Sequence, residues 1–101
     1  MNRLLDRFPR EEMHSPGADL DYGFDWTEEG YLEAGETIAS QAWVVPAGLT
    51  TSNPAITGSA TVTSTKIKGG DYGRDYLCIN SIVTSSGRGD SRSLMLRCRY
   101  Y

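Results

Sequence analysis

Histidine and cysteine are scarce in this chain of 101 residues, and that scarcity limits the chemistry it can support. The single histidine, His14, lies beside Ser15 and Pro16, so a histidine-based metal site or a nucleophile with a histidine base lacks parts. Cys78 and Cys98 have no second cysteine pair and no nearby histidine, which is not the spacing of a zinc site. We therefore expect His14 to be a surface residue and the protein to be no enzyme, with no cofactor.

Long apolar runs are also missing. No stretch approaches the length that crosses a bilayer, and the first six residues lack the apolar core of a secretory signal. We expect no membrane partner and synthesis in a cytoplasm. Thiols stay reduced there, so Cys78 and Cys98 are predicted to be buried and free rather than joined in a disulfide.

The chain has no surplus of positive charge, since its formal net charge is -3. Binding to phosphate backbones requires clustered Lys and Arg, so no nucleic-acid partner is expected. The charge is unevenly distributed: residues 1–36 hold three arginines and ten acids, a net of -7, and the remainder carries +4. This asymmetry would help copies stack or an acidic arm dock on a basic neighbour, and solvated faces are the simpler interpretation.

What is present is a series of short alternating stretches in a chain that is 39% hydrophobic and 23% charged, an ordinary composition for one globular domain. Residues 20–26 alternate large apolar side chains with aspartates, which predicts a half-buried strand with charges guarding an edge. Residues 36–45 predict another strand, with a bulge near Ser40 or Gln41 because Ile38 is out of phase with Trp43. In the Thr-rich region 49–68, Val62 and Ile67 fall on opposite faces, and the sequence does not decide which is exposed.

Residues 71–101 read as a β-hairpin, around which we expect the fold to be organised. A turn about Arg88 would pair Ile82 with Leu94 and place the two cysteines opposite each other. Tyr76 lies two residues before Cys78, as in the tyrosine corner of immunoglobulin-like domains, where the phenol bonds to backbone just upstream.

Together these stretches predict an all-β protein, an immunoglobulin-like antiparallel β-sandwich of six to seven strands over residues 19–101. Residues 1–18 show no sustained period and predict an extended N-terminal arm. The predicted core consists of Tyr22, Phe24, Trp26, Trp43, Tyr76, Cys78, Ile82, Leu94, Leu96 and Cys98.

Two short motifs suggest binding without strong support. Residues 88–90 spell Arg-Gly-Asp, the tripeptide read by animal-cell adhesion receptors, at the expected hairpin tip; ordinary turn chemistry explains it better. Asp71, Asp75 and Asp90 would offer oxygen ligands to Ca²⁺, but no ordered loop pattern accompanies them, so no metal is expected.

The chain resembles a family of small tailed-bacteriophage virion proteins, fiber-tail adaptor or minor tail proteins with an immunoglobulin-like fold. The likeness covers residues 19–99 and rests on a combination of stretches rather than on any one of them. They include Leu20-Asp21-Tyr22 with Asp25-Trp26, Gly35-Glu36-Thr37-Ile38, Trp43-Val44-Val45-Pro46-Ala47-Gly48-Leu49-Thr50, Gly69-Gly70, Asp75-Tyr76, Asn80-Ser81-Ile82-Val83-Thr84, Ser86-Gly87-Arg88 and Arg92-Ser93-Leu94. Cys78 and Cys98 depart from the family pattern, which has Val-like residues there.

This resemblance implies a non-enzymatic virion structural protein, made in the host bacterial cytoplasm and present in several copies per particle. It would join the tail or neck to fibers through its N-terminal arm and loops, and its partners would be tail, neck, portal or fiber subunits. Deleting residues 1–17 should then leave a folded monomer that no longer joins the particle. The candidate partner-binding residues of the arm are Arg3, Leu4, Leu5, Arg7 and Phe8.

Two alternatives stay open at this point. One is a capsid decoration or cement protein, which copy number would distinguish from an adaptor. The other is a carbohydrate-binding or adhesive module that uses exposed aromatics such as Tyr31 and Tyr72.

Overall fold

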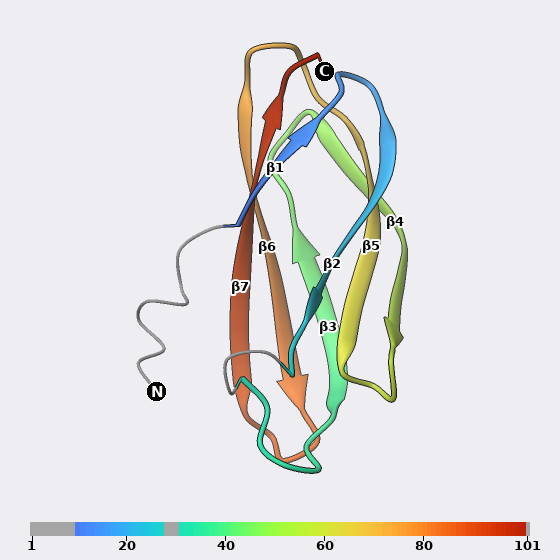
Figure 1. Cartoon of the computed structure of the whole chain (residues 1–101), viewed down its shortest axis with the longest axis vertical. Helices are drawn as coiled ribbons and strands as arrows, with labels where there is room; N and C mark the ends of the chain where they lie inside the picture. The colour runs from blue at the N-terminus through green and yellow to red at the C-terminus, as the bar shows by residue number, and fades with distance from the viewer. Residues whose placement is uncertain (1–9, 28–30, 101) are drawn as a thin grey trace.

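The computed structural model describes residues 10–27 and 31–100, and this part of the chain forms seven strands and no helix (Figure 1). The strands are β1 (Arg10–His14), β2 (Asp19–Asp25), β3 (Ile38–Val44), β4 (Leu49–Thr57), β5 (Val62–Gly69), β6 (Asp75–Thr84) and β7 (Gly89–Cys98). They build a four-stranded sheet in the order β1-β7-β6-β3 and a three-stranded sheet in the order β2-β5-β4. The predicted all-β sandwich is confirmed, and its immunoglobulin-like character stays a prediction. Within the described residues no helix is long and apolar enough to cross a membrane.

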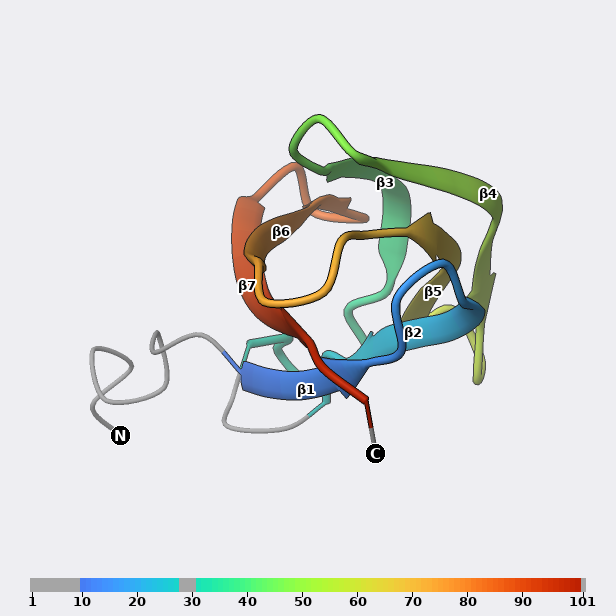
Figure 2. The ribbon, with the colours of Figure 1, turned by 90° about the horizontal axis from the view of Figure 1, so that it is seen from above.

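The two sheets enclose one core. Seen from above, β1 and β2 lie on one side of the sandwich and β3 and β4 on the opposite side (Figure 2). Burying a large apolar side chain contributes about 1.5 to 3 kcal/mol to the free energy of folding, so the inward-facing apolar residues of the two sheets are the main source of stability. The buried apolar residues are Phe24, Trp26, Tyr31, Ile38, Leu49, Ile67, Tyr76, Cys78, Ile82, Leu94, Leu96 and Cys98, with Tyr22 and Trp43 partly buried against them.

The β6–β7 hairpin forms as expected, but its predicted register is wrong. Tyr76 pairs with Leu96, Cys78 with Leu94 and Ile82 with Asp90, so the hairpin is centred on Ser86 instead of Arg88. A tight turn causes this: Gly87 N–H donates to the Thr84 carbonyl at 2.9 Å, and Gly87 has φ of +85°. A three-residue turn ending on a left-handed glycine fits the twist of paired strands. The partner of each β6 residue lies an even number of residues from the predicted one along β7, as for Ile82, which pairs with Asp90 instead of Leu94. Every inward residue therefore stays inward.

The expectations for the individual strands fare better. β2 is an edge strand with its aspartates outward, and Phe24 within it and Trp26 just after it are buried, although Leu20 is 40% exposed. The bulge in β3 lies between Ile38 and Ser40, as predicted. In β5, Ile67 is the buried residue and Val62 the partly exposed one, which resolves the open question of phase.

The first strand was not expected. Residues 10–14, assigned by sequence to the arm, form β1, which pairs in parallel with the end of β7, from Arg10 opposite Leu94 to His14 opposite Cys98. His14, predicted to lie on the surface, is fully buried. Its imidazole finds three polar partners, on Ala18, Tyr22 and Gly69, which a buried polar group requires.

The predicted corner at Tyr76 has the expected hydrogen bond. Asp71 N–H donates to the Tyr76 hydroxyl at 3.0 Å, and the ring is buried. The phenol therefore anchors the turn that leads from β5 into β6.

Candidate functional site

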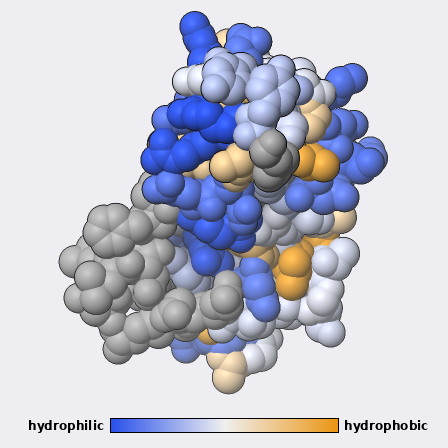
Figure 3. All heavy atoms as spheres, turned by 45° about the horizontal axis from the view of Figure 1, so that its top comes forward, coloured by the Kyte–Doolittle hydropathy of each residue, from blue (hydrophilic) through white to orange (hydrophobic). Residues whose placement is uncertain are grey.

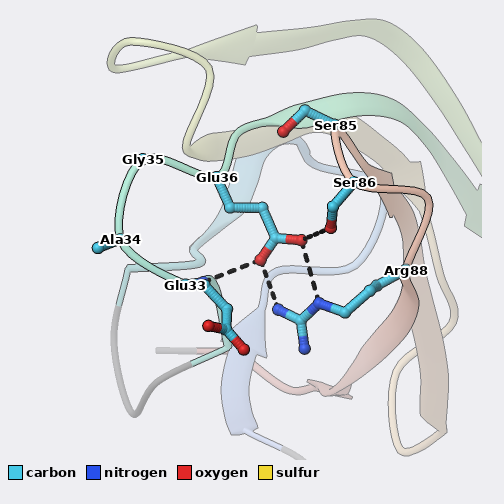
Figure 4. A pocket seen from close by; sticks show the side chains of 7 residues that line it. All are labelled: Glu33, Ala34, Gly35, Glu36, Ser85, Ser86 and Arg88. Carbon is cyan, nitrogen blue, oxygen red and sulfur yellow. Dashed lines mark hydrogen bonds and ion pairs between the residues drawn. The ribbon is translucent and has the colours of Figure 1, made fainter.

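A buried carboxylate joins two loops at one end of the sandwich (Figure 4). Glu36, which precedes β3, receives hydrogen bonds from Ser86, from Thr84 at 2.5 Å and from the Glu33 N–H at 2.9 Å. Arg88 adds a two-pronged contact, with its Nε 3.0 Å from one oxygen of Glu36 and its Nη2 bonded to the other. We call Glu36, Thr84, Ser86 and Arg88 the Glu36 cluster.

The electrostatics of the cluster favour a permanent ion pair. The Arg88 guanidinium, with the Glu33 amide and the two hydroxyls, holds the pKa of Glu36 far below its ordinary value. The carboxylate in turn raises the pKa of Arg88. With five donors on its two oxygens, Glu36 stays ionised near neutral pH. The cluster is a structural clamp.

The clamp fixes the shape of the surrounding surface. Arg88 Nη2 also donates to the Tyr31 carbonyl at 3.1 Å, and the Ser85 N–H donates to the Thr37 carbonyl at 2.7 Å. The loop 31–37 and residues 84–88, the hairpin tip with its two flanking residues, are thus tied together. Between them lies a hollow of about 340 Å³, lined by Glu33, Ala34, Gly35, Glu36, Ser85, Ser86 and Arg88.

This arrangement settles where the Arg-Gly-Asp tripeptide lies. Arg88 is engaged with Glu36, and Gly89 and Asp90 belong to β7, where they pair with Val83 and Ile82. The hairpin tip is the segment 85–87 instead. The expectation that the tripeptide sits at the tip is wrong, because the turn is two residues earlier.

At the other end of the sandwich, His14 ties three segments together. Its Nε2–H donates to the carbonyls of Ala18 and Gly69, each at 3.1 Å, and Nδ1 shares a hydrogen bond of 2.7 Å with the Tyr22 hydroxyl. The sequence analysis missed this role of His14. The available signal was weak: Tyr22, eight residues later in a predicted strand, offers a hydroxyl as a partner.

Aromatic rings gather at two places. Arg92 lies over the rings of Phe24 and Tyr31, with its Cζ 4.7 and 4.6 Å from their centroids, and stacks there as a cation on aromatic faces. Tyr31, considered above as an exposed aromatic, is in fact 2% exposed. Tyr72 is exposed and stacks on exposed Tyr100 with centroids 5.3 Å apart.

The outer faces of the two sheets differ in character. On the four-stranded sheet, outward pairs join Leu77 to Met95 and Val44 to Ile79 across neighbouring strands, and Val83 lies on the same face. On the three-stranded sheet, outward Asp19 and Asp21 lie opposite Lys68 and Lys66. The outer face of the four-stranded sheet therefore mixes exposed apolar groups with serines such as Ser81 and Ser93, whereas these outward pairs of the three-stranded sheet are charged.

Charged residues lie on the same outer face of the four-stranded sheet near β1. Arg97 pairs with Glu11 at 2.7 Å and with Asp75 at 2.9 Å, and Arg99 reaches Asp75 at 3.2 Å. These pairs lower the pKa of Glu11 and raise that of Arg97. The view in Figure 3 shows hydrophilic residues over much of this end of the molecule, with hydrophobic residues in small separate patches.

Both cysteines are buried and free, and neither is placed to react. Burial raises the pKa of Cys78 to about 11 and raises that of Cys98 as well. Because the thiolate is the reactive form, these thiols behave as small apolar side chains.

Two sets of predicted residues remain to be placed. The arm residues Arg3, Leu4, Leu5, Arg7 and Phe8 lie outside the described residues. Among residues 10–27 and 31–100 there is no group of three or more His, Cys, Asp or Glu side chains that would hold a metal ion.

The fold and the site define a small all-β sandwich whose end loops are tied together by the Glu36 cluster, with exposed apolar residues on the outer face of the four-stranded sheet. A family model described as podophage GP4 fiber-tail adaptor protein gp77 matches residues 14–97, which is most of the chain. The chain therefore belongs to this family of phage fiber-tail adaptor proteins. A search among curated proteins finds no match.

Proposed function

We propose that this chain is a non-enzymatic structural subunit of a tailed-phage virion that joins the tail or neck to fibers. The match to the fiber-tail adaptor family over residues 14–97 is the observation that carries the proposal. Fold alone would not, since sandwiches serve many functions. The Glu36 cluster supports it, because polar groups that fully satisfy one another maintain shape and leave no acid or base for catalysis.

The contacts to neighbouring virion proteins would come from the N-terminal arm and from the clamped loops. The arm offers Arg3, Leu4, Leu5, Arg7 and Phe8, a set with three apolar side chains and two arginines, and arginine and aromatic residues are enriched in interfaces. The loops 31–37 and 84–88 offer a surface whose shape is set before binding. A preorganised loop loses less conformational entropy on association.

The test uses the phage that encodes this chain, complemented with variants of it. Ala34 is exposed on the lining of the hollow, so Ala34→Arg should obstruct a partner there without disturbing the core. The matched control is Thr57→Arg, an exposed residue at the end of β4. We expect particles with Ala34→Arg, or with residues 2–9 deleted, to have at least a few-fold fewer fibers by electron microscopy than the control.

Normal fiber numbers on both variant particles would contradict the use of the arm and these loops. Quantitative mass spectrometry of purified particles separates the adaptor from the capsid decoration alternative. An adaptor requires tens of copies or fewer, and a count in the hundreds would favour decoration.

A further inference from the structure

The four edge strands of the two sheets are protected to very different degrees. Native sheets shield their edges with charges, proline or bulges, because exposed backbone groups pair with other chains. β1 carries Arg10, Glu11 and Glu12, and β2 carries three aspartates. β4 contains Pro54 and a register break between Ser52 and Ala55, with Asn53 at φ of +50°. Three of the four edges are therefore shielded.

β3 is the exception. After the bulge between Ile38 and Ser40, its residues 40–44 read Ser-Gln-Ala-Trp-Val, with regular pairing to β6 and neither charge nor proline. They belong to a stretch of the sequence, residues 37–65, that contains no Asp, Glu, Lys, Arg or His. Within the described part of the chain, no strand pairs with β3 on the side away from β6.

The surface beside this edge is apolar. Val44 is 62% exposed and neighbours Ile79 on the outer face, where Leu77 and Val83 are 41% and 46% exposed. A strand added to β3 would cover Val44 as well as pair its backbone groups. Both gains come from the same contact, which is how peptide strands bind to sheet edges.

The point at which the chain enters the four-stranded sheet bears on what could pair with the β3 edge. The chain enters at β1, and β3 is the opposite edge of the same sheet, with β7 and β6 between. Residues 3–9 come directly before Arg10 and span about 23 Å when extended at roughly 3.3 Å per residue. The seven residues of β3 need about 23 Å. To reach β3 of its own copy, this segment would have to cross β7 and β6. It reaches β3 of a second copy, placed beside β1, without crossing any strand.

We propose that the N-terminal residues 3–8 of one copy pair with β3 of the next copy and extend its four-stranded sheet. The segment brings Leu4, Leu5 and Phe8 to an apolar rim, and its charges Arg3, Asp6 and Arg7 meet no like charge in the uncharged stretch 37–65. The contact is heterologous, so repeated copies form a ring or a filament. This inference rests on the proposed function only in requiring several copies side by side.

Disulfide trapping between two differently tagged full-length variants tests the pairing directly. One carries Arg7→Cys and the other Ala42→Cys, an exposed position in β3, while the native cysteines are buried. After mixing and mild oxidation, non-reducing gels should show the mixed dimer at several times the yield of the control mixture, Arg7→Cys with Thr57→Cys. Equal yields in the two mixtures would overturn the proposal. So would self-linking of Ala42→Cys in excess of the mixed dimer, which would indicate symmetric pairing of two β3 edges.

A second measurement uses the size of the purified protein. The unmodified chain should form oligomers in light scattering, and Ala42→Lys, which places a charge on the edge, should be monomeric with an unchanged circular dichroism spectrum. The matched control Thr57→Lys should remain oligomeric. Monomers of all three proteins at high concentration, without trapping, would overturn the inference. Fiber loss from particles that lack residues 2–9 would then still support the adaptor function with another virion protein as the partner of the arm.

Discussion

At the scale of single residues, Glu36 shows how a buried carboxylate is held by donors from two loops. Its oxygens accept five hydrogen bonds, including two from Arg88, and its side chain is 5% exposed. Removing the charge would leave the partly exposed Arg88 guanidinium and the hydroxyls of Thr84 and Ser86 competing for fewer acceptors. The resulting loss should appear as lower stability and a looser loop 31–37.

We predict that Glu36→Gln lowers the melting temperature by more than Glu33→Gln, a change to an exposed neighbour in the same loop. The pH dependence follows from the depressed pKa of Glu36. Its contribution is fully present above the ordinary value of 4.5 and is lost as the pH falls toward the lower folded-state pKa. The difference between the unmodified chain and Glu36→Gln should therefore stay constant near neutral pH and narrow below about pH 4.5. Thermal unfolding across this range measures it, and a difference that widens in acid would contradict the assignment.

The cysteines allow a second prediction at this scale. With the pKa of Cys78 near 11 instead of 9.0, its thiolate fraction near pH 8 falls about a hundredfold, and burial slows attack further. Labelling by a disulfide reagent should be at least about a hundredfold slower in buffer than in urea. Urea should release two reactive thiols per chain, and release of none would mean that Cys78 and Cys98 are joined.

At the scale of elements, the corner between β5 and β6 depends on two glycines that differ in their surroundings. Gly70 and Gly73 have φ of +94° and +86°, a backbone region that side chains disfavour. A Cβ at Gly73 would meet nothing within 4 Å, whereas one at Gly70 would collide with the Cys98 sulfur and lie 3.5 Å from Leu49. Gly73 is therefore constrained by its backbone conformation alone, and Gly70 also by packing.

We predict that Gly73→Ala costs about 1 kcal/mol in the free energy of unfolding, the usual cost of a left-handed alanine. Gly70→Ala should cost about 1 to 3 kcal/mol more through overpacking. Urea denaturation gives both values. In a double-mutant cycle, Cys98→Ala should recover most of the additional loss of stability caused by Gly70→Ala and none of the loss caused by Gly73→Ala. Equal losses for the two glycine variants would contradict the packing of Gly70 against Cys98.

Element by element, local patterns predicted strands well and their partners poorly. The alternation around Phe24 and the phase break at Ile38 are properties of a few consecutive residues, so the strand and the bulge were found. The centre of the β6–β7 hairpin depends on where Thr84 and Gly87 close a turn, and Ser85 to Asp90 offers more than one such place. β1 was missed because a five-residue strand with three charged residues shows no alternation until β7 lies beside it.

At the scale of the whole molecule, residues 10–14, which the sequence assigned to an arm of residues 1–18, form β1 and pair with β7 in the sandwich. Deleting residues 2–9 should change the melting temperature by less than about 4 °C, since it removes no described strand. Deleting residues 2–17 removes β1 and His14, uncovers the edge of β7, and should lower it by more than about 8 °C. Calorimetry of the two truncations tests this, and similar melting temperatures would place β1 outside the cooperative unit.

The sequence alone determined the strand-rich character, the inward aromatic row and the likeness to a phage adaptor family, because alternation and turn residues act over a few positions. Only the tertiary structure decided which edges are left open, where His14 is buried and what Glu36 binds. These outcomes depend on groups far apart in the chain, such as Glu36 and Arg88, that folding brings together. The same holds for the contrast between an uncharged β3 edge and three shielded ones, since an edge exists only once the sheet order is known.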